Sequence, residues 1–273
     1  MALSVLFLAG CAAHVSFPNA NPHAPLRIPA MLYRPEGSGP FPAVVLLHGC
    51  GGVAPTHDDW ARWFRERGYV AFIVDSWDPR GINDPTCSEE GPDVDVFARF
   101  DDAIGALRYL QSLRFVEPAR IGVIGWSNGG VYAMAVINGP SLERAVKRGL
   151  TLPSPGYAAA VGVYPGNCYS YVKEQVVKPL LVLIGEADDW ILAGPCVEMV
   201  NAMRSRGADA SIVTYPGAYH YFDVRGQPLE VLANVENLNL PGGCCGATVG
   251  YDAAAAADAH RRVEEFFGRH LKR

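Results

Sequence analysis

The sequence predicts an α/β protein built on a mostly parallel sheet that helices cover on both faces. Short, nearly continuous apolar runs of the kind that form buried strands alternate with longer amphipathic segments. This alternation is typical of a chain in which helices connect parallel strands. The chain has 273 residues, 49% of them hydrophobic, which is enough to bury a large core without metals or crosslinks. No linker, repeat or low-complexity tract interrupts residues 30–273, so we expect one domain there.

Each element of this fold follows from a local pattern. Apolar runs predict strands at residues 43–47, 70–74, 121–124, 158–163, 180–184 and 211–214. Apolar residues at helical spacing predict helices near residues 59–67, 96–110, 131–137 and 196–204. The last helix is expected to begin after Asp252, a good N-cap, and to turn Val263, Phe266 and Phe267 inward.

Charge and hydropathy exclude two classes of partner. The net charge is −5, and the 23 lysines and arginines are scattered without a basic run, so we expect no nucleic acid partner. No apolar stretch approaches the roughly 18 residues that a membrane-spanning helix requires.

Residues 1–29 predict a processing signal followed by a flexible segment. Residues 1–10 are apolar or small, and residues 8–11 (LAGC) resemble a bacterial lipobox, in which cleavage precedes a cysteine that carries lipid. The basic front end of a signal peptide is missing, since the first arginine or lysine is Arg27. We expect an exported, periplasmic or cell-envelope lipoprotein anchored in the membrane through Cys11. The alternative is a cytoplasmic protein whose apolar N-terminus carries a cysteine by chance.

Export also accounts for the seven cysteines. If Cys11 carries lipid, six remain, and an oxidising compartment permits three disulfides among them. Positions after neighbouring strand ends favour pairing Cys50 with Cys87 and Cys168 with Cys196, which leaves Cys244 and Cys245 as a vicinal pair. A metal site is not expected, because zinc ligands are typically two to four residues apart and the only close pair is adjacent.

The motif with the clearest chemistry is GWSNG at residues 125–129, between a predicted strand and a predicted helix. This G-x-S-x-G pattern forms a nucleophile elbow, a turn so sharp that glycine is needed on both sides and the serine projects from it. The pattern predicts Ser127 as a nucleophile. The alternative interpretation is a glycine-rich turn in which the same serine caps the helix.

A serine nucleophile needs an acid and a base after later strands, in that chain order. Among the seven histidines, His220 follows a predicted strand end after the elbow and is the expected base. The strand ending at residue 184 leads into Asp188 and Asp189; we favour Asp188 because a shift of one residue in a turn redirects the carboxylate.

The oxyanion of an acyl transfer needs two hydrogen-bond donors. One is expected to be the backbone N–H of Asn128, directly after the nucleophile. The other is expected in the loop HGCGG at residues 48–52, from the N–H of Cys50 or, alternatively, of Gly49. In this scheme His48 is structural, and the Cys50 side chain is not a nucleophile.

Several motifs together resemble the dienelactone hydrolase family of α/β-hydrolases: LLHGCGG, VDSWDPRG, IGVIGWSNGG, LVLIGEADDW and YPGAYHYF, in that order from about residue 30. The resemblance implies an eight-stranded sheet of the α/β-hydrolase fold flanked by helices, no metal or other cofactor, and a triad of Ser127, Asp188 and His220. The namesake enzymes differ in using a cysteine nucleophile. They also bind the lactone carboxylate with arginines, one of them at the position of Val224, so the namesake lactone is a doubtful substrate.

Four further residues are candidates for substrate binding. Arg80 is a possible carboxylate anchor, although a solvated loop arginine is the alternative. Trp77, Trp126 and Trp190 follow strand ends or lie in the elbow, so they could line an aromatic pocket or, alternatively, pack in the core. We therefore expect a serine hydrolase acting on a small ester or lactone. The alternatives are a polyesterase, a sugar-ester esterase or a peptidase on the same scaffold, and a lipid-anchored binding protein without catalysis.

Overall fold

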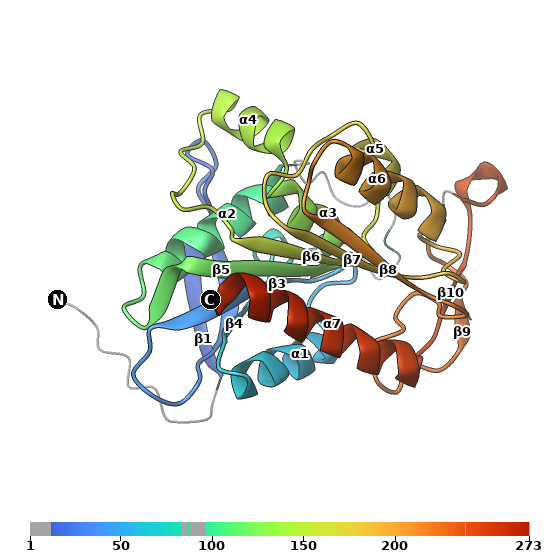
Figure 1. Cartoon of the computed structure of the whole chain (residues 1–273), viewed down its shortest axis with the longest axis horizontal. Coiled ribbons are helices and arrows are strands. Elements are labelled where there is room, and N and C mark those ends of the chain that lie inside the picture. The colour runs from blue at the N-terminus through green and yellow to red at the C-terminus, as the bar shows by residue number, and fades with distance from the viewer. Residues whose placement is uncertain (1–11, 83–86, 88–96, 238, 273) are drawn as a thin grey trace.

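A central sheet between two layers of helices dominates the computed structural model, which describes residues 12–82, 87, 97–237 and 239–272 (Figure 1). The eight strands lie in the order β1-β2-β4-β3-β5-β6-β7-β8, and only the pairings of β2 with β1 and β4 are antiparallel. The strands are β1 (Ala13–Pro18), β2 (Arg27–Tyr33), β3 (Phe41–Leu47), β4 (Val70–Val74), β5 (Val116–Trp126), β6 (Ala159–Val163), β7 (Leu180–Gly185) and β8 (Ala210–Tyr215). The predicted fold class is confirmed.

The helices divide between the two faces of the sheet. Helices α1 (Pro55–Glu66) and α7 (Ala253–Leu271) cover one face, and α2 (Ala98–Gln111), α3 (Asn128–Ala135) and α6 (Ala193–Ser205) cover the other (Figure 1). The short helices α4 (Gly139–Lys147) and α5 (Cys168–Tyr171) lie outside α3 and α6. As expected, Asp252 caps α7 by accepting hydrogen bonds from two backbone amides of its first turn.

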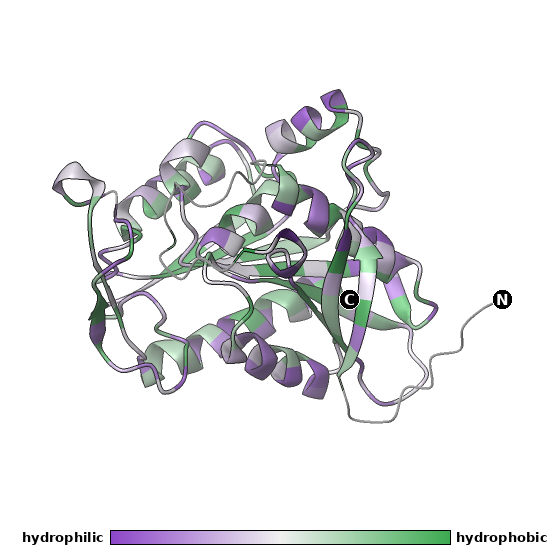
Figure 2. Ribbon diagram, turned by 180° about the vertical axis from the view of Figure 1, so that it is seen from behind, coloured by the Kyte–Doolittle hydropathy of each residue, from purple (hydrophilic) through white to green (hydrophobic). Residues whose placement is uncertain are grey.

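Both faces of the central strands are buried. All side chains of β4, β6 and β7 are buried, and Figure 2 shows mostly hydrophobic central strands between helices that carry both hydrophobic and hydrophilic residues. Each Val, Leu or Ile removed from water in this way contributes about 1.5–3 kcal/mol to stability. The helical layer is close enough that a Cβ at Gly122 would lie 2.6 Å from the Phe267 ring.

The start of the folded domain corrects one expectation. Residues 13–29 were expected to be flexible, but they supply β1 and the first part of β2, which pair from Ala13 with Leu32 to Pro18 with Arg27. Two prolines and an edge position hide this pair in the sequence, because an edge strand carries exposed side chains between its few buried ones. The sheet thus begins near residue 13 rather than residue 30. Cys11 lies outside the described residues, so its lipidation stays a prediction.

The three predicted disulfides are present. Cys50 pairs with Cys87 across a Cα–Cα distance of 5.3 Å, and Cys168 with Cys196 across 4.9 Å, which ties α5 to α6. Cys244 pairs with its neighbour Cys245.

Thiol titration tests these disulfides. Protein made in an oxidising compartment and denatured without reductant should expose no more than one thiol, from Cys11, and six more after reduction. Seven free thiols before reduction would contradict the three bridges.

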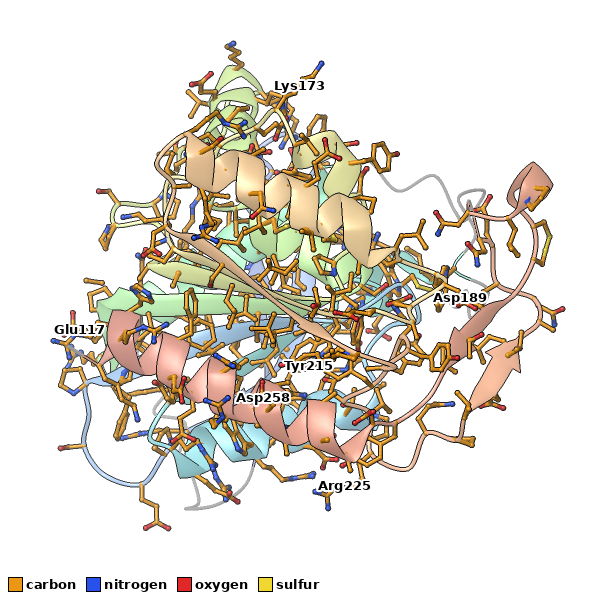
Figure 3. All side chains as sticks on the ribbon, turned by 45° about the vertical axis from the view of Figure 1, so that its right-hand side comes forward. Glu117, Lys173, Asp189, Tyr215, Arg225 and Asp258 are labelled. Atoms are coloured by element: carbon orange, nitrogen blue, oxygen red, sulfur yellow. A yellow bond between two sulfur atoms is a disulfide. The ribbon has the colours of Figure 1, made fainter. Side chains whose placement is uncertain are left out.

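A two-stranded ribbon lies beyond β8 and was not predicted. Strand β9 (Glu230–Leu232) pairs with β10 (Ala247–Val249), and the short helix η2 (Pro241–Gly243) lies in the segment between them (Figure 1). Asp189, labelled in Figure 3, lies beside this ribbon and accepts hydrogen bonds from the backbone N–H and the hydroxyl of Thr248.

In the described part of the chain, no helix is long and apolar enough to span a membrane.

Candidate active site

Ser127 occupies a sharp turn between β5 and α3. Its φ of 51° and ψ of −117° are unusual for a residue with a side chain, and such strain costs about 1–3 kcal/mol. The glycines on either side are required for close packing: a Cβ at Gly125 would lie 2.1 Å from the carbonyl oxygen of Gly129, and one at Gly129 would lie 2.1 Å from that of Leu47. This geometry is that of a nucleophile elbow.

Asp188 and His220 form a buried pair at the ends of β7 and β8. Nδ1 of His220 donates to Oδ2 of Asp188 at 2.8 Å, and both side chains are inaccessible to solvent. The other carboxylate oxygen of Asp188 accepts from the backbone amides of Trp190 (3.0 Å) and Ile191 (2.8 Å). Nε2 of His220 is buried and has no hydrogen-bond partner among the described residues. The ring is thus oriented by its carboxylate, and its second nitrogen remains able to accept a proton.

Two aromatic rings hold His220 from the sides. The ring centroids of Tyr164 and Trp190 lie 4.2 Å and 4.9 Å from that of His220. The loop that carries Tyr164 also contacts the elbow, since the Ser127 N–H donates to the Val163 carbonyl at 3.0 Å. The end of β6 therefore joins the elbow to the histidine.

The structure distinguishes the two candidate acids. Asp188 contacts His220, whereas the carboxylate of Asp189 points to the ribbon and bonds Thr248. The backbone carbonyl of Asp189 accepts from the side-chain amide of Asn237 at 3.1 Å. Asp189 therefore holds the turn that contains Asp188 against the ribbon of β9 and β10.

The loop at residues 48–52 lies beside Ser127. A Cβ at Gly49 would lie 3.6 Å from the Cβ of Ser127. The backbone N–H of Ser76 donates to Nε2 of His48 at 3.2 Å, so Nδ1 carries the proton of the neutral ring and donates to the Gly49 carbonyl at 2.6 Å. Burial and the nearby Arg99 keep the pKa of His48 well below its usual value. His48 thus has a structural position in this loop.

A cavity of about 590 Å³ opens at the elbow. Ser127, Asn128 and Cys50 line it, as does Trp190, and the Cys50–Cys87 disulfide forms part of its wall. Aromatic side chains from α2 and the residue before it, from α3 and from α5 supply other parts of the lining, namely Phe97, Phe100, Tyr132, Tyr169 and Tyr171. Such a cavity is large enough to enclose a small organic molecule.

Three of the four residues expected to bind substrate lie elsewhere. Arg80, in the short helix η1 (Asp78–Arg80), forms a two-pronged ion pair with the buried Asp102 at 2.8 and 3.0 Å, so its guanidinium is already engaged. Trp126 is buried and donates to Asp223 at 2.7 Å. Trp77 donates to the Cys50 carbonyl at 2.5 Å and is not among the described residues that line the cavity. Only Trp190 has the expected location.

A buried carboxylate that the sequence analysis missed lies behind the site. Asp223 accepts hydrogen bonds from the indole nitrogens of Trp60 (2.9 Å) and Trp126 (2.7 Å), and from the hydroxyl of Tyr164 (2.7 Å). Burial and this carboxylate raise the pKa of Tyr164 well above its ordinary value. Asp223 thereby fixes the ring that packs on His220.

Replacing Asp223 by alanine is expected to lower the free energy of unfolding by about 3–5 kcal/mol, because three buried donors then lose their acceptor. Urea unfolding followed by circular dichroism measures the change. Asp258→Ala, which removes ion pairs on the partly exposed face of α7, serves as the control and should cost less than about 1 kcal/mol. Equal effects of the two changes would contradict this role for Asp223.

Arg99 is a second buried residue near the site to which the sequence analysis assigned no role. It is 2% exposed, and its guanidinium donates to the main-chain carbonyl of His48 at 2.5 Å and to the side-chain oxygen of Asn128. The only sign of such a role in the sequence was a charged residue on the buried face of the helix predicted at residues 96–110.

Among the described residues, no group of three or more His, Cys, Asp or Glu side chains is placed to hold a metal ion.

Known proteins resemble this chain over most of its length. The sequence profile of the dienelactone hydrolase family matches residues 28–271. A putative carboxymethylenebutenolidase of Synechocystis sp. is 24% identical over 278 residues, covering 94% of this chain and 96% of that protein. A probable 2-oxo-3-(5-oxofuran-2-ylidene)propanoate lactonase of Bradyrhizobium sp. is 26% identical over 197 residues, covering 71% of this chain and 78% of that protein.

Solved structures show the same fold. A putative dienelactone hydrolase from Klebsiella pneumoniae superposes with a TM-score of 0.67 at 22% identity, covering 94% of this chain and 99% of that one. Esterase 2 of Thermogutta terrifontis phosphorylated by paraoxon superposes with a TM-score of 0.66 at 17% identity, covering 96% and 95%. With the family profile spanning nearly the whole described chain, the elbow and the buried Asp188–His220 pair place this protein in the dienelactone hydrolase family.

Proposed function

We propose that the protein is a serine hydrolase that cleaves a small carboxylic ester or lactone through an acyl-enzyme intermediate. The observation that carries the proposal is the buried Asp188–His220 pair, whose Nε2 has no hydrogen-bond partner among the described residues. The imidazole packs on Tyr164, and the neighbouring Val163 carbonyl accepts from the N–H of Ser127, so the end of β6 links the pair to the elbow. An elbow serine, a histidine and an orienting carboxylate are the three parts that this chemistry needs.

The first half-reaction forms the acyl-enzyme. Oγ of Ser127 attacks the carbonyl carbon while Nε2 of His220 takes the hydroxyl proton, and Asp188 stabilises the imidazolium and its orientation. The backbone amides of Asn128 and Cys50 donate to the tetrahedral oxyanion. Its collapse breaks the bond to the leaving alcohol oxygen, which receives the proton from His220. In the second half-reaction, His220 takes a proton from water, whose oxygen attacks the acyl carbon. Collapse breaks the bond to Oγ of Ser127, which takes the proton back from His220, and the acid leaves.

The lining of the cavity favours a substrate with an apolar or aromatic part. Trp190 and the rings near α2, α3 and α5 provide apolar contact. Two arginines also line the cavity, but Arg144 is ion-paired with Glu174 and Arg148 with Asp101, just as Arg80 is paired with Asp102. We therefore favour neutral esters or lactones over an anionic lactone anchored by Arg80.

Covalent labelling tests the proposal directly. A fluorophosphonate probe, or paraoxon, should modify one residue, and peptide mass spectrometry should locate the modification on Ser127. The fraction of activity lost toward a short-chain aryl ester should equal the fraction of protein that is labelled. Protein that does not react with the probe yet hydrolyses the ester, or that keeps full activity after Ser127 is labelled, would disprove the serine mechanism. No turnover of any compound in a panel of esters, lactones and amides would favour a binding protein.

We further propose that the protein is exported and carries lipid on Cys11. Three disulfides support an oxidising compartment. The mass of the protein purified from membranes should include a diacylglyceryl group at Cys11, and Cys11→Ser should abolish that mass. An unmodified cysteine in the native protein would contradict lipidation.

A further inference from the structure

Arg99 is a buried cation whose hydrogen bonds go to uncharged groups. The described contacts of its guanidinium are the carbonyl of His48, the side-chain oxygen of Asn128 and a longer contact of 3.4 Å to Nδ1 of His48. Its Nε is buried without a partner among the described residues. Burial lowers the pKa of Arg99 to about 10, which still leaves the group charged at neutral pH. No carboxylate of the described residues hydrogen-bonds this guanidinium, although Asp102 and Asp75 favour its charged form through their own charge. Burying a charge in this way is costly, so the position of Arg99 calls for an explanation.

The two groups that Arg99 bonds belong to the two segments expected to stabilise the oxyanion. Asn128 directly follows the nucleophile, and His48 begins the loop that contains Cys50. One terminal nitrogen of the guanidinium reaches Asn128 and the other reaches His48, so a single rigid planar group spans the gap between the segments.

Aromatic rings fix the guanidinium in this place. Its central carbon lies 4.7 Å from the ring centroid of Trp77 and 5.2 Å from that of Tyr132. Trp77 also donates to the Cys50 carbonyl. The loop is therefore held at the carbonyl of His48 by Arg99 and at the carbonyl of Cys50 by the ring against which Arg99 packs.

The direction of the expected Cys50 donor follows from these contacts. In a trans peptide the N–H of one residue points opposite to the carbonyl of the residue before it. The Gly49 carbonyl points to Nδ1 of His48, from which it accepts a hydrogen bond, so the Cys50 N–H points away from that ring. Arg99 stabilises the neutral state of His48 by its charge and anchors the same residue by its carbonyl.

We propose that Arg99 is a positioning residue for the oxyanion hole, in which its guanidinium sets the separation and direction of the Asn128 and Cys50 amides. The inference rests on the proposed serine mechanism. Arg99 acts through these two segments and does not itself touch the substrate. A lysine retains the charge but is a point donor on a flexible stem, so it cannot span both acceptors in the same way.

Two single variants and their combination test this role in the full-length protein. Arg99→Lys should lower kcat for a short-chain aryl ester about 10- to 100-fold and change KM less than about threefold, because the lost interaction acts mainly in the transition state. Asn128→Ala keeps the backbone N–H and removes the side-chain oxygen that Arg99 binds, and should lower kcat about 10-fold. The double variant should be no slower than Arg99→Lys, since both changes break one linkage.

Binding of a transition-state analogue separates positioning from general damage to the fold. A boronic acid that forms a tetrahedral adduct with Ser127 should bind Arg99→Lys more weakly by the same factor as the loss in kcat. Rates are expressed per site titrated with fluorophosphonate, so unfolded protein does not count. Arg108→Lys changes a partly exposed arginine of the same helix and should match the wild type.

The outcomes are distinct for the two proposals. Wild-type protein that neither hydrolyses the ester nor labels at Ser127 overturns the serine mechanism itself. An active wild type with kcat of Arg99→Lys within twofold of it overturns the role of Arg99 alone. If Arg99→Lys does not fold, Asn128→Ala decides: an unchanged kcat and an unchanged boronate affinity in that variant overturn the positioning role.

Discussion

Ser127→Ala is expected to lower kcat for a short-chain aryl ester by about a million-fold. The remaining rate would come from substrate binding and the oxyanion donors alone. The hydroxyl oxygen is the attacking atom, and the other candidates at the cavity are poorly placed to replace it: Cys50 and Cys87 are joined in a disulfide, and Ser141 lies in α4 rather than at the elbow. The initial rate of chromogenic alcohol release measures the effect.

The fold of this variant should be intact. Alanine fits the space of the serine, and the glycines that permit the turn are unchanged. Thermal unfolding should therefore occur within a few degrees of the wild type. A variant that unfolds like the wild type and retains its esterase activity would exclude Ser127 as the nucleophile.

Asp188→Asn is expected to lower kcat by about ten thousand-fold while leaving substrate binding largely unchanged. An amide of the same shape keeps acceptor capacity for the Trp190 and Ile191 backbone N–H groups. It no longer stabilises the imidazolium, and it favours the tautomer of His220 whose Nε2 already carries a proton. Steady-state kinetics on the same ester separate the loss in kcat from any change in KM.

Asp189→Asn is the matched control at the adjacent position. Its carboxylate bonds Thr248 of the ribbon rather than the histidine, so kcat should fall less than about tenfold. If the two substitutions exchanged their effects, Asp189 would be the acid and the orientation of the turn would be wrong.

Local patterns were sufficient to predict the chain order of the site. The strands that lead to Ser127 and Asp188 end in apolar runs that are buried on both faces, which leaves little choice of structure. Strand β8, which precedes His220, is only partly buried. The elbow adds a backbone requirement that only glycine meets, and a requirement of this kind is visible in sequence.

The residues that were missed or misplaced depend on partners remote in the chain. Trp126 was expected in the substrate pocket, but its indole meets Asp223, which is 97 residues away. Arg99 bonds a main-chain carbonyl 51 residues away, and a carbonyl has no signature in the sequence. Strand β1 was missed because an edge strand buries few side chains, and its pairing with β2 is the main sign of its existence.

The early start of the sheet limits how far the protein could extend from a membrane. If Cys11 carries lipid, Ala12 is the sole residue between the anchor and β1, so the tether is about 3.5 Å per residue and shorter than a lipid headgroup layer. A body held this closely cannot tumble freely, and the β1 edge of the sheet would face the bilayer. The cavity at the elbow would then meet its ligands close to the lipid surface.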